Sequence, residues 1–157
     1  MFIEDEFTEL KIELTKDIKK EIVAFANTNG GKIYVGISDD GKVIGLKNAK
    51  KDMESLSGMI REGIKSDLTI YTQISIKKME NKDVILINIM ESPNKPYYLV
   101  EKGIKTSGVY LRYGNTSAPA NEEVIKKLLI ENQGDSFETM ISKNQDIHFE
   151  TLKNLNR

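Results

Sequence analysis

Cysteine is absent from this sequence of 157 residues, and histidine occurs once. Without cysteine the chain has no disulfide framework, no thiolate nucleophile and no cysteine-based zinc site. The single His148 excludes a histidine cluster and argues against a catalytic triad that needs a histidine base. Composition alone therefore excludes disulfide, thiolate, cysteine–zinc and histidine-cluster sites and disfavours a histidine-dependent triad.

A long apolar run and a strong charge bias are also missing. No segment approaches the roughly 18 apolar residues of a membrane-spanning helix, and the acidic start, Met1 to Glu6, lacks the apolar stretch of a signal peptide. Lys+Arg 23 against Asp+Glu 24 give a net charge of -1, which excludes a polybasic, histone-like protein. We expect a soluble, cytoplasmic protein with no membrane partner.

The length and the 39% of apolar residues fit one compact domain. Apolar periodicity predicts an α/β (α+β) fold, with a mixed sheet of about six strands with hairpins, packed by about three helices. The predicted strands span 9–14, 33–37, 73–79, 83–90, 97–100 and 108–114. The predicted helices run from Asp17 to the stop at Asn29-Gly30-Gly31, over 49–66 and over 122–131.

Three local details follow from the same patterns. In strand 9–14 the alternation predicts a buried face of Leu10, Ile12 and Leu14. Asp17 and Asn121 are the expected N-caps of the first and third helices. From Gly134 onward the periodicity weakens, so the division is a domain over 1–134 and a tail, or the start of a truncated C-terminal region, over 135–157.

Three acidic residues, Glu4, Glu9 and Asp39, lie near two strands that become neighbours if residues 9–14 and 33–37 pair. Converging carboxylates suit Mg²⁺ or Mn²⁺, and such a metal orients a phosphate and generates a hydroxide nucleophile. Lys11 projects from the same strand face as Glu9 and could stabilise charge on a scissile phosphate. The alternative is that these side chains form an ordinary solvated surface, which is the commoner fate of charged residues.

The glycine-rich stretch Asn27 to Lys32 does not match a nucleotide-binding loop. A Walker loop precedes a helix, whereas these glycines follow a predicted helix and lead into a strand, and the Rossmann spacing is absent too. We therefore expect no ATP as cofactor. A helix C-cap with a tight turn is the favoured interpretation, and phosphate contact by its backbone N–H groups is the alternative.

A second polar segment combines Tyr110 and Arg112 with Asn115 and Thr116. A cation, aromatic faces and small donors suit contacts to a nucleic-acid backbone and stacking on bases. The alternative is that Val109, Leu111 and Tyr113 form a core face while Tyr110 and Arg112 are ordinary surface. Net charge is -4 over residues 1–40, +4 over 41–134 and -1 over 135–157, which fits an acidic site beside a basic rim or unrelated patches.

Four stretches resemble the Schlafen AlbA-like domain, also called a divergent AAA or DNA-binding domain: Glu4 to Lys11, Ile22 to Gly41, Gly45, and Gly108 to Thr116. The most specific part is the run A-F-A-N-T-x-G-G followed by G-I-x-D-D-G. The resemblance covers most of residues 4–131. It implies nucleic-acid binding on a mixed α/β domain, found in bacteria at the N-terminus of transcriptional regulators.

Some animal members of this family are metal-dependent RNA endonucleases, and their three acidic residues match Glu4, Glu9 and Asp39. Those enzymes join two such domains into a cleft, so one copy would need a homodimer. The sequence thus favours a nucleic-acid-binding, chiefly DNA-binding, domain of a bacterial transcriptional regulator. The alternatives are a Mg²⁺- or Mn²⁺-dependent endoribonuclease acting on structured RNA, and an interaction module whose tail docks on a missing region.

Overall fold

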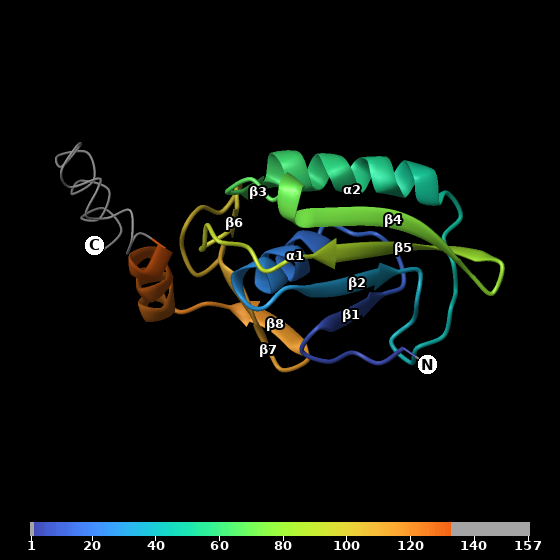
Figure 1. Ribbon diagram of the computed structural model, residues 1–157, viewed down its shortest axis with the longest axis horizontal. Coiled ribbons are helices and arrows are strands. Elements are labelled where there is room, and N and C mark those ends of the chain that lie inside the picture. Colours follow the sequence, from blue (N-terminus) through green and yellow to red (C-terminus); the bar gives the residue numbers. More distant parts are fainter. Residues whose placement is uncertain (1, 133–157) are drawn as a thin grey trace.

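The computed structural model describes residues 2–132; the predicted tail, including His148, lies outside them. Within this range the chain forms a mixed α+β fold (Figure 1). The α-helices are α1 (Ile18–Asn27), α2 (Ala49–Gly63) and a helix over 122–132, and η1 (Thr69–Tyr71) is a 3₁₀ turn. The strands are β1 (Thr8–Lys11), β2 (Gly31–Val35), β3 (Ile64–Lys65), β4 (Thr72–Met79), β5 (Lys82–Ile89), β6 (Tyr98–Leu99), β7 (Tyr110–Tyr113) and β8 (Thr116–Pro119).

Four strands form the main sheet in the order β1-β2-β5-β4. β1 and β2 are parallel because α1 carries the chain back between them, whereas β5 pairs antiparallel with both β2 and β4. The predicted hairpin is confirmed as β4–β5, and positive φ at Glu80 and Asn81 builds its two-residue turn. β3 pairs with β6 and β7 with β8, each as a separate small sheet.

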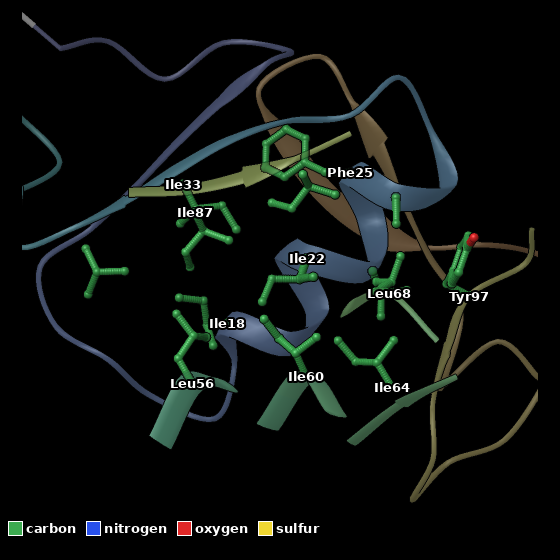
Figure 2. Packing of buried hydrophobic residues seen from close by; sticks show 14 of the residues in the cluster. Ile18, Ile22, Phe25, Ile33, Leu56, Ile60, Ile64, Leu68, Ile87 and Tyr97 are labelled. Carbon is green, nitrogen blue, oxygen red and sulfur yellow. The ribbon is translucent and has the colours of Figure 1, made fainter. Parts of the chain in front are cut away.

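The main core lies between the sheet and the two helices α1 and α2. Strand alternation sends Ile33 and Ile87 toward the helices, where they meet Ile22 and Phe25 of α1 and Leu56 of α2, all fully buried (Figure 2). Burying a side chain of this size contributes roughly 1.5–3 kcal/mol, so this layer supplies most of the stabilisation. The pattern-based prediction of amphipathic helices on a sheet is confirmed.

Two sequence predictions need correction near the N-terminus. β1 ends at Lys11, so Ile12 is 52% exposed rather than part of a buried face. Asp17 precedes α1 but its side chain makes no capping hydrogen bond. Asn121 does cap the last helix, since its Oδ1 accepts from the Val124 N–H at 2.9 Å, and that prediction is confirmed.

The glycine-rich turn after α1 has the expected structural role. The Gly30 N–H donates to the Phe25 carbonyl at 2.8 Å, and its φ of +74° is a left-handed conformation that glycine adopts at little cost. A Cβ at Gly30 would lie 2.6 Å from the Ile89 carbonyl oxygen. This N–H is engaged in the helix end, which agrees with the C-cap interpretation rather than with phosphate binding.

Asn27 at the end of α1 fastens two distant segments. Its buried amide donates to the Tyr97 carbonyl at 2.9 Å and to the Tyr110 carbonyl at 3.0 Å, and its Oδ1 accepts from the Tyr97 N–H at 2.6 Å. One side chain thereby joins α1, the 91–97 loop and β7. Asn27 belongs to the A-F-A-N-T-x-G-G run that carries the family resemblance, and its role there is to form this buried hydrogen-bond network.

We predict that Asn27→Asp destabilises the fold strongly. A carboxylate would face the Tyr97 and Tyr110 carbonyl oxygens and lose both donors, at a cost of roughly 2–4 kcal/mol of unfolding free energy. Urea unfolding followed by circular dichroism measures it, with the exposed Asn94→Asp as control. Equal midpoints for the two variants would contradict the assigned role of Asn27.

Candidate nucleic-acid interface

Arg112 of β7 is buried, with only 1% of its side chain exposed. Its Nη1 donates to Glu9 Oε1 of β1 at 2.6 Å and to Ser117 Oγ of β8 at 3.1 Å. Its Nη2 donates to the backbone carbonyls of Asp5 and Thr8 at 2.9 and 3.0 Å. The guanidinium therefore ties the β7–β8 hairpin to the N-terminal segment and to the edge strand of the main sheet.

The helix α1 completes the surroundings of this guanidinium. The Arg112 guanidinium carbon lies 4.6 Å from the centre of the Phe25 ring, a cation–π arrangement. Glu21 of α1 is 3.5 Å from Arg112 Nη1 and 2.9 Å from Lys11 Nζ, and Lys11 is 3.5 Å from Glu9. Two cations and two carboxylates thus alternate between β1, α1 and β7.

Glu4 joins this charge cluster from the N-terminal segment. Its Oε2 accepts from the Leu10 N–H at 3.1 Å, and its carboxyl shares a hydrogen bond with that of Glu9. Burial raises the pKa of Glu9 to about 7, and the hydrogen bond to Glu4 and the charge of Glu21 add to the rise against the opposing effect of Arg112. Glu9 is therefore the carboxyl of this pair that takes up a proton as the pH falls through about 7.

The pKa values of Glu4 and Lys11 are also shifted, each in the direction that favours the charged form of the side chain. Burial opposes ionisation of Glu4, but the hydrogen bonds from Glu9 and the Leu10 N–H, with the charge of Lys11, outweigh it and lower its pKa. Burial also opposes the charge of Lys11, but the ion pairs with Glu21 and Glu9 outweigh it and raise its pKa. Glu9 is thus the member that titrates near neutrality.

The predicted metal ligands do not come together in this structure. The carboxyls of Glu4 and Glu9 interact, whereas Asp39 is exposed in the turn enclosed by the Ile37–Val43 bridge. Among residues 2–132, no group of three or more His, Asp or Glu side chains is placed to hold a metal ion. One oxygen of Glu9 is also occupied by Arg112. This donor set does not fit the predicted Mg²⁺ or Mn²⁺ site, and the catalytic role of Glu4, Glu9, Lys11 and Asp39 stays a prediction.

The position of Arg112 does not favour direct contact with nucleic acid, because only 1% of its side chain is exposed and its guanidinium donates to Glu9, Ser117 and the Asp5 and Thr8 carbonyls. The core-face interpretation of this strand is right for Val109, which is fully buried, and for Leu111, which packs against the same cluster. It is wrong for Tyr113, which is 48% exposed, and for Arg112, which is buried rather than ordinary surface. A guanidinium among carboxylates and carbonyl oxygens costs less to bury than an isolated charge, so pairing allows Arg112 to lie inside.

The tip of the β7–β8 hairpin carries the exposed part of the predicted interface. Tyr113, Asn115 and Thr116 are all exposed there, around Gly114 with φ of +58° at the first position of the two-residue turn. Tyr110, at the other end of β7, is half-buried, and Lys20 Nζ of α1 lies 5.7 Å from its ring centre. Below the tip, the Arg112 N–H donates to Thr28 Oγ1 at 2.9 Å.

Sequence reasoning missed Glu21 and Ser117 as partners of Arg112. Glu21 sits on an amphipathic helix among Lys19 and Lys20, where a surface role is the default expectation. Its place beside Arg112 depends on how β7 packs on α1, which no local pattern encodes.

None of the helices within residues 2–132 combines the length and apolarity needed to cross a membrane.

The family model described as Schlafen, AlbA_2 matches residues 4–121. The chain belongs to this family. The matched span starts at Glu4 and includes the Arg112 cluster and both hairpins, so the resemblance found in the sequence motifs is confirmed. The expected mixed α+β domain is confirmed with it.

Solved structures share the fold at low identity. The DIP2311 protein from Corynebacterium diphtheriae is similar with a TM-score of 0.60 and 18% identity over 80% of this chain. The N-terminal domain of a protein from Nitrosomonas europaea, described as related to the ATP-dependent DNA helicase RecG, has a TM-score of 0.50 and 19% identity, covering 73% of this chain and 78% of that one. This chain matches only 27% of the length of the Corynebacterium protein.

We predict that Arg112→Met lowers the free energy of unfolding by roughly 3–5 kcal/mol. The substitution leaves the Glu9 carboxyl and the Asp5 and Thr8 carbonyls without their donor in a buried place. Arg61→Met on the exposed side of α2 is the matched control and should change stability by less than about 0.5 kcal/mol. Urea unfolding compares the two, and equal losses would rule out the anchoring role of Arg112.

We also predict a pH dependence of stability that comes from Glu9. Its pKa is raised on folding from 4.5 to about 7, so the stabilisation is full below about pH 4.5 and is lost as the pH rises through 7. Wild-type stability should fall by an amount on the order of 3 kcal/mol between about pH 5 and pH 8, and Glu9→Gln should flatten that fall. Parallel urea series for the two proteins measure it; identical pH profiles would refute the shifted pKa.

Proposed function

We propose that this domain binds nucleic acid through the tip of the β7–β8 hairpin. The observation that carries the proposal is an exposed group of an aromatic ring, an amide and a hydroxyl, Tyr113, Asn115 and Thr116, on a hairpin fixed from below by a buried arginine. Aromatic faces stack on bases, and amide and hydroxyl groups bond to phosphate oxygens.

The anchoring of the hairpin favours binding because it reduces the entropy lost on association. Arg112 joins the hairpin to β1 and to α1 by side-chain bonds, and the Arg112 N–H bond to Thr28 adds a backbone link. Tip residues on a preordered hairpin lose little freedom when a ligand binds. Lys20, 45% exposed over the Tyr110 ring, adds a cation beside the hairpin.

We propose DNA as the main target, in the setting of a bacterial cytoplasmic transcriptional regulator. Membership of the Schlafen AlbA_2 family supports a nucleic-acid ligand, and the helicase-related name of the Nitrosomonas protein supports DNA. RNA is the alternative, and a homodimer that joins two domains remains part of the proposal. Metal-dependent RNA cleavage has less support, since within residues 2–132 Asp39 does not join Glu4 and Glu9 in a group that could hold a metal ion.

We predict that Tyr113→Ala weakens binding of DNA by roughly 5- to 150-fold in Kd, which corresponds to one lost stacking contact of about 1–3 kcal/mol. Fluorescence anisotropy at low salt measures Kd for labelled duplex DNA, single-stranded DNA and RNA in turn. Asn115→Ala and Thr116→Ala should each weaken binding less, since each removes one hydrogen bond.

Ile70→Ala is the control, because Ile70 is 74% exposed next to β4, at the opposite edge of the sheet from the hairpin. It should bind as the wild type does. If the wild type binds none of the three nucleic acids, the proposed function fails. If it binds and Tyr113→Ala binds equally well, the tip is not the contact surface.

A further inference from the structure

The main sheet has a second face that the helices α1 and α2 do not use. Register places Lys32, Asn88 and Gln73 in one row across β2, β5 and β4, and Tyr34, Leu86 and Ser75 in the next row. Lys77 follows on β4. These seven residues, here called the open face, point away from the helix-covered side that holds Ile33 and Ile87.

The open face is accessible to solvent across three strands. Lys32, Gln73 and Lys77 are exposed, and Tyr34, Ser75, Leu86 and Asn88 are half-buried. At one end of the face Leu10 and Val84 are buried with Ile37 and Val43, and Tyr34 packs against this cluster. The rest of the face is polar except for Leu86.

The charge of this surface has one sign. The seven residues comprise two lysines, two amides, one hydroxyl, one aromatic residue and one leucine, and none is acidic. The next lysine along β4, Lys78, points to the helix side and pairs with Asp83 at 2.8 Å. In residues 2–132 no carboxylate pairs in this way with Lys32 or Lys77, so both cations are available to an anionic ligand.

An aromatic pair borders the lysines. The Tyr34 ring lies 4.8 Å from the Phe2 ring, tilted by 51°, and both residues are half-buried. Tyr34 lies two positions from the exposed Lys32 on the same strand face. Aromatic rings beside cations are the combination that binds single-stranded nucleic acid without base-specific contacts.

We infer that the open face binds single-stranded nucleic acid, with Lys32 and Lys77 on phosphates and a base stacked at Tyr34. A flat sheet of four strands does not enter the major groove of a duplex, which admits a helix or a two-stranded ribbon, whereas splayed single-strand bases lie well on a sheet. This inference rests on the proposed function. It adds a second binding surface, the open face, and specifies single-stranded rather than duplex nucleic acid as its ligand.

The test is a salt titration of binding to a labelled single strand of about 15 nucleotides, DNA and RNA separately, for the full 157-residue chain. The double variant Lys32→Gln/Lys77→Gln removes two phosphate contacts. It should reduce the slope of log K against log salt by about 1.4 and weaken binding on the order of tenfold at about 0.1 M salt. Tyr34→Leu should weaken binding with no change in slope.

Lys50→Gln/Lys51→Gln is the matched control, because it makes the same charge change at exposed positions in the first turn of α2. It should leave the slope as in the wild type. Equal slopes for both double variants, with binding intact, would overturn the open-face inference while leaving the hairpin proposal standing. A stronger effect of the open-face variant on duplex than on single strands would also overturn it. Absence of binding by the wild type would instead contradict the proposed function.

Discussion

The buried guanidinium of Arg112 is the interaction on which the arrangement of this domain depends. It lies between the edge strand β1, the helix α1 and the hairpin β7–β8, elements far apart in the sequence. A buried cation is tolerated because Glu9, Glu21 and two backbone carbonyls surround it. Without it, the hairpin would lose its polar attachment to the sheet and the N-terminal segment would lose its donor.

Much of the fold follows from the sequence because apolar periodicity records which side of each element is buried. The helices α1 and α2 and the hairpin β4–β5 are predicted from local spacing alone. β8 is missed, since Thr116 to Pro119 is short and polar and becomes a strand only by pairing with β7. β1 is predicted too long because Ile12 continues the alternation after the pairing with β2 has ended.

The candidate site is less predictable than the fold, for an electrostatic reason. Charged residues are assigned to the surface by default, and the sequence marks Glu9, Lys11 and Arg112 as residues that could act on a ligand. Their burial depends on each finding a partner of opposite charge on another element, which is a property of the tertiary structure. Asn115 and Thr116 are exposed at the hairpin tip, as expected of polar turn residues because turn chemistry is local, and their contact with nucleic acid stays a prediction.

Arg112 is a buried structural residue, distinct from the exposed residues that we propose as contacts to nucleic acid. An NMR titration with single-stranded DNA tests this most directly, because backbone amides and the Arg112 side-chain N–H groups are observed together. We expect shifts at Tyr113, Asn115 and Thr116 and on Lys32 of the open face, with the Arg112 side-chain signals unchanged. The largest shifts at the Arg112 guanidinium, with the hairpin tip and Lys32 unaffected, would contradict the account.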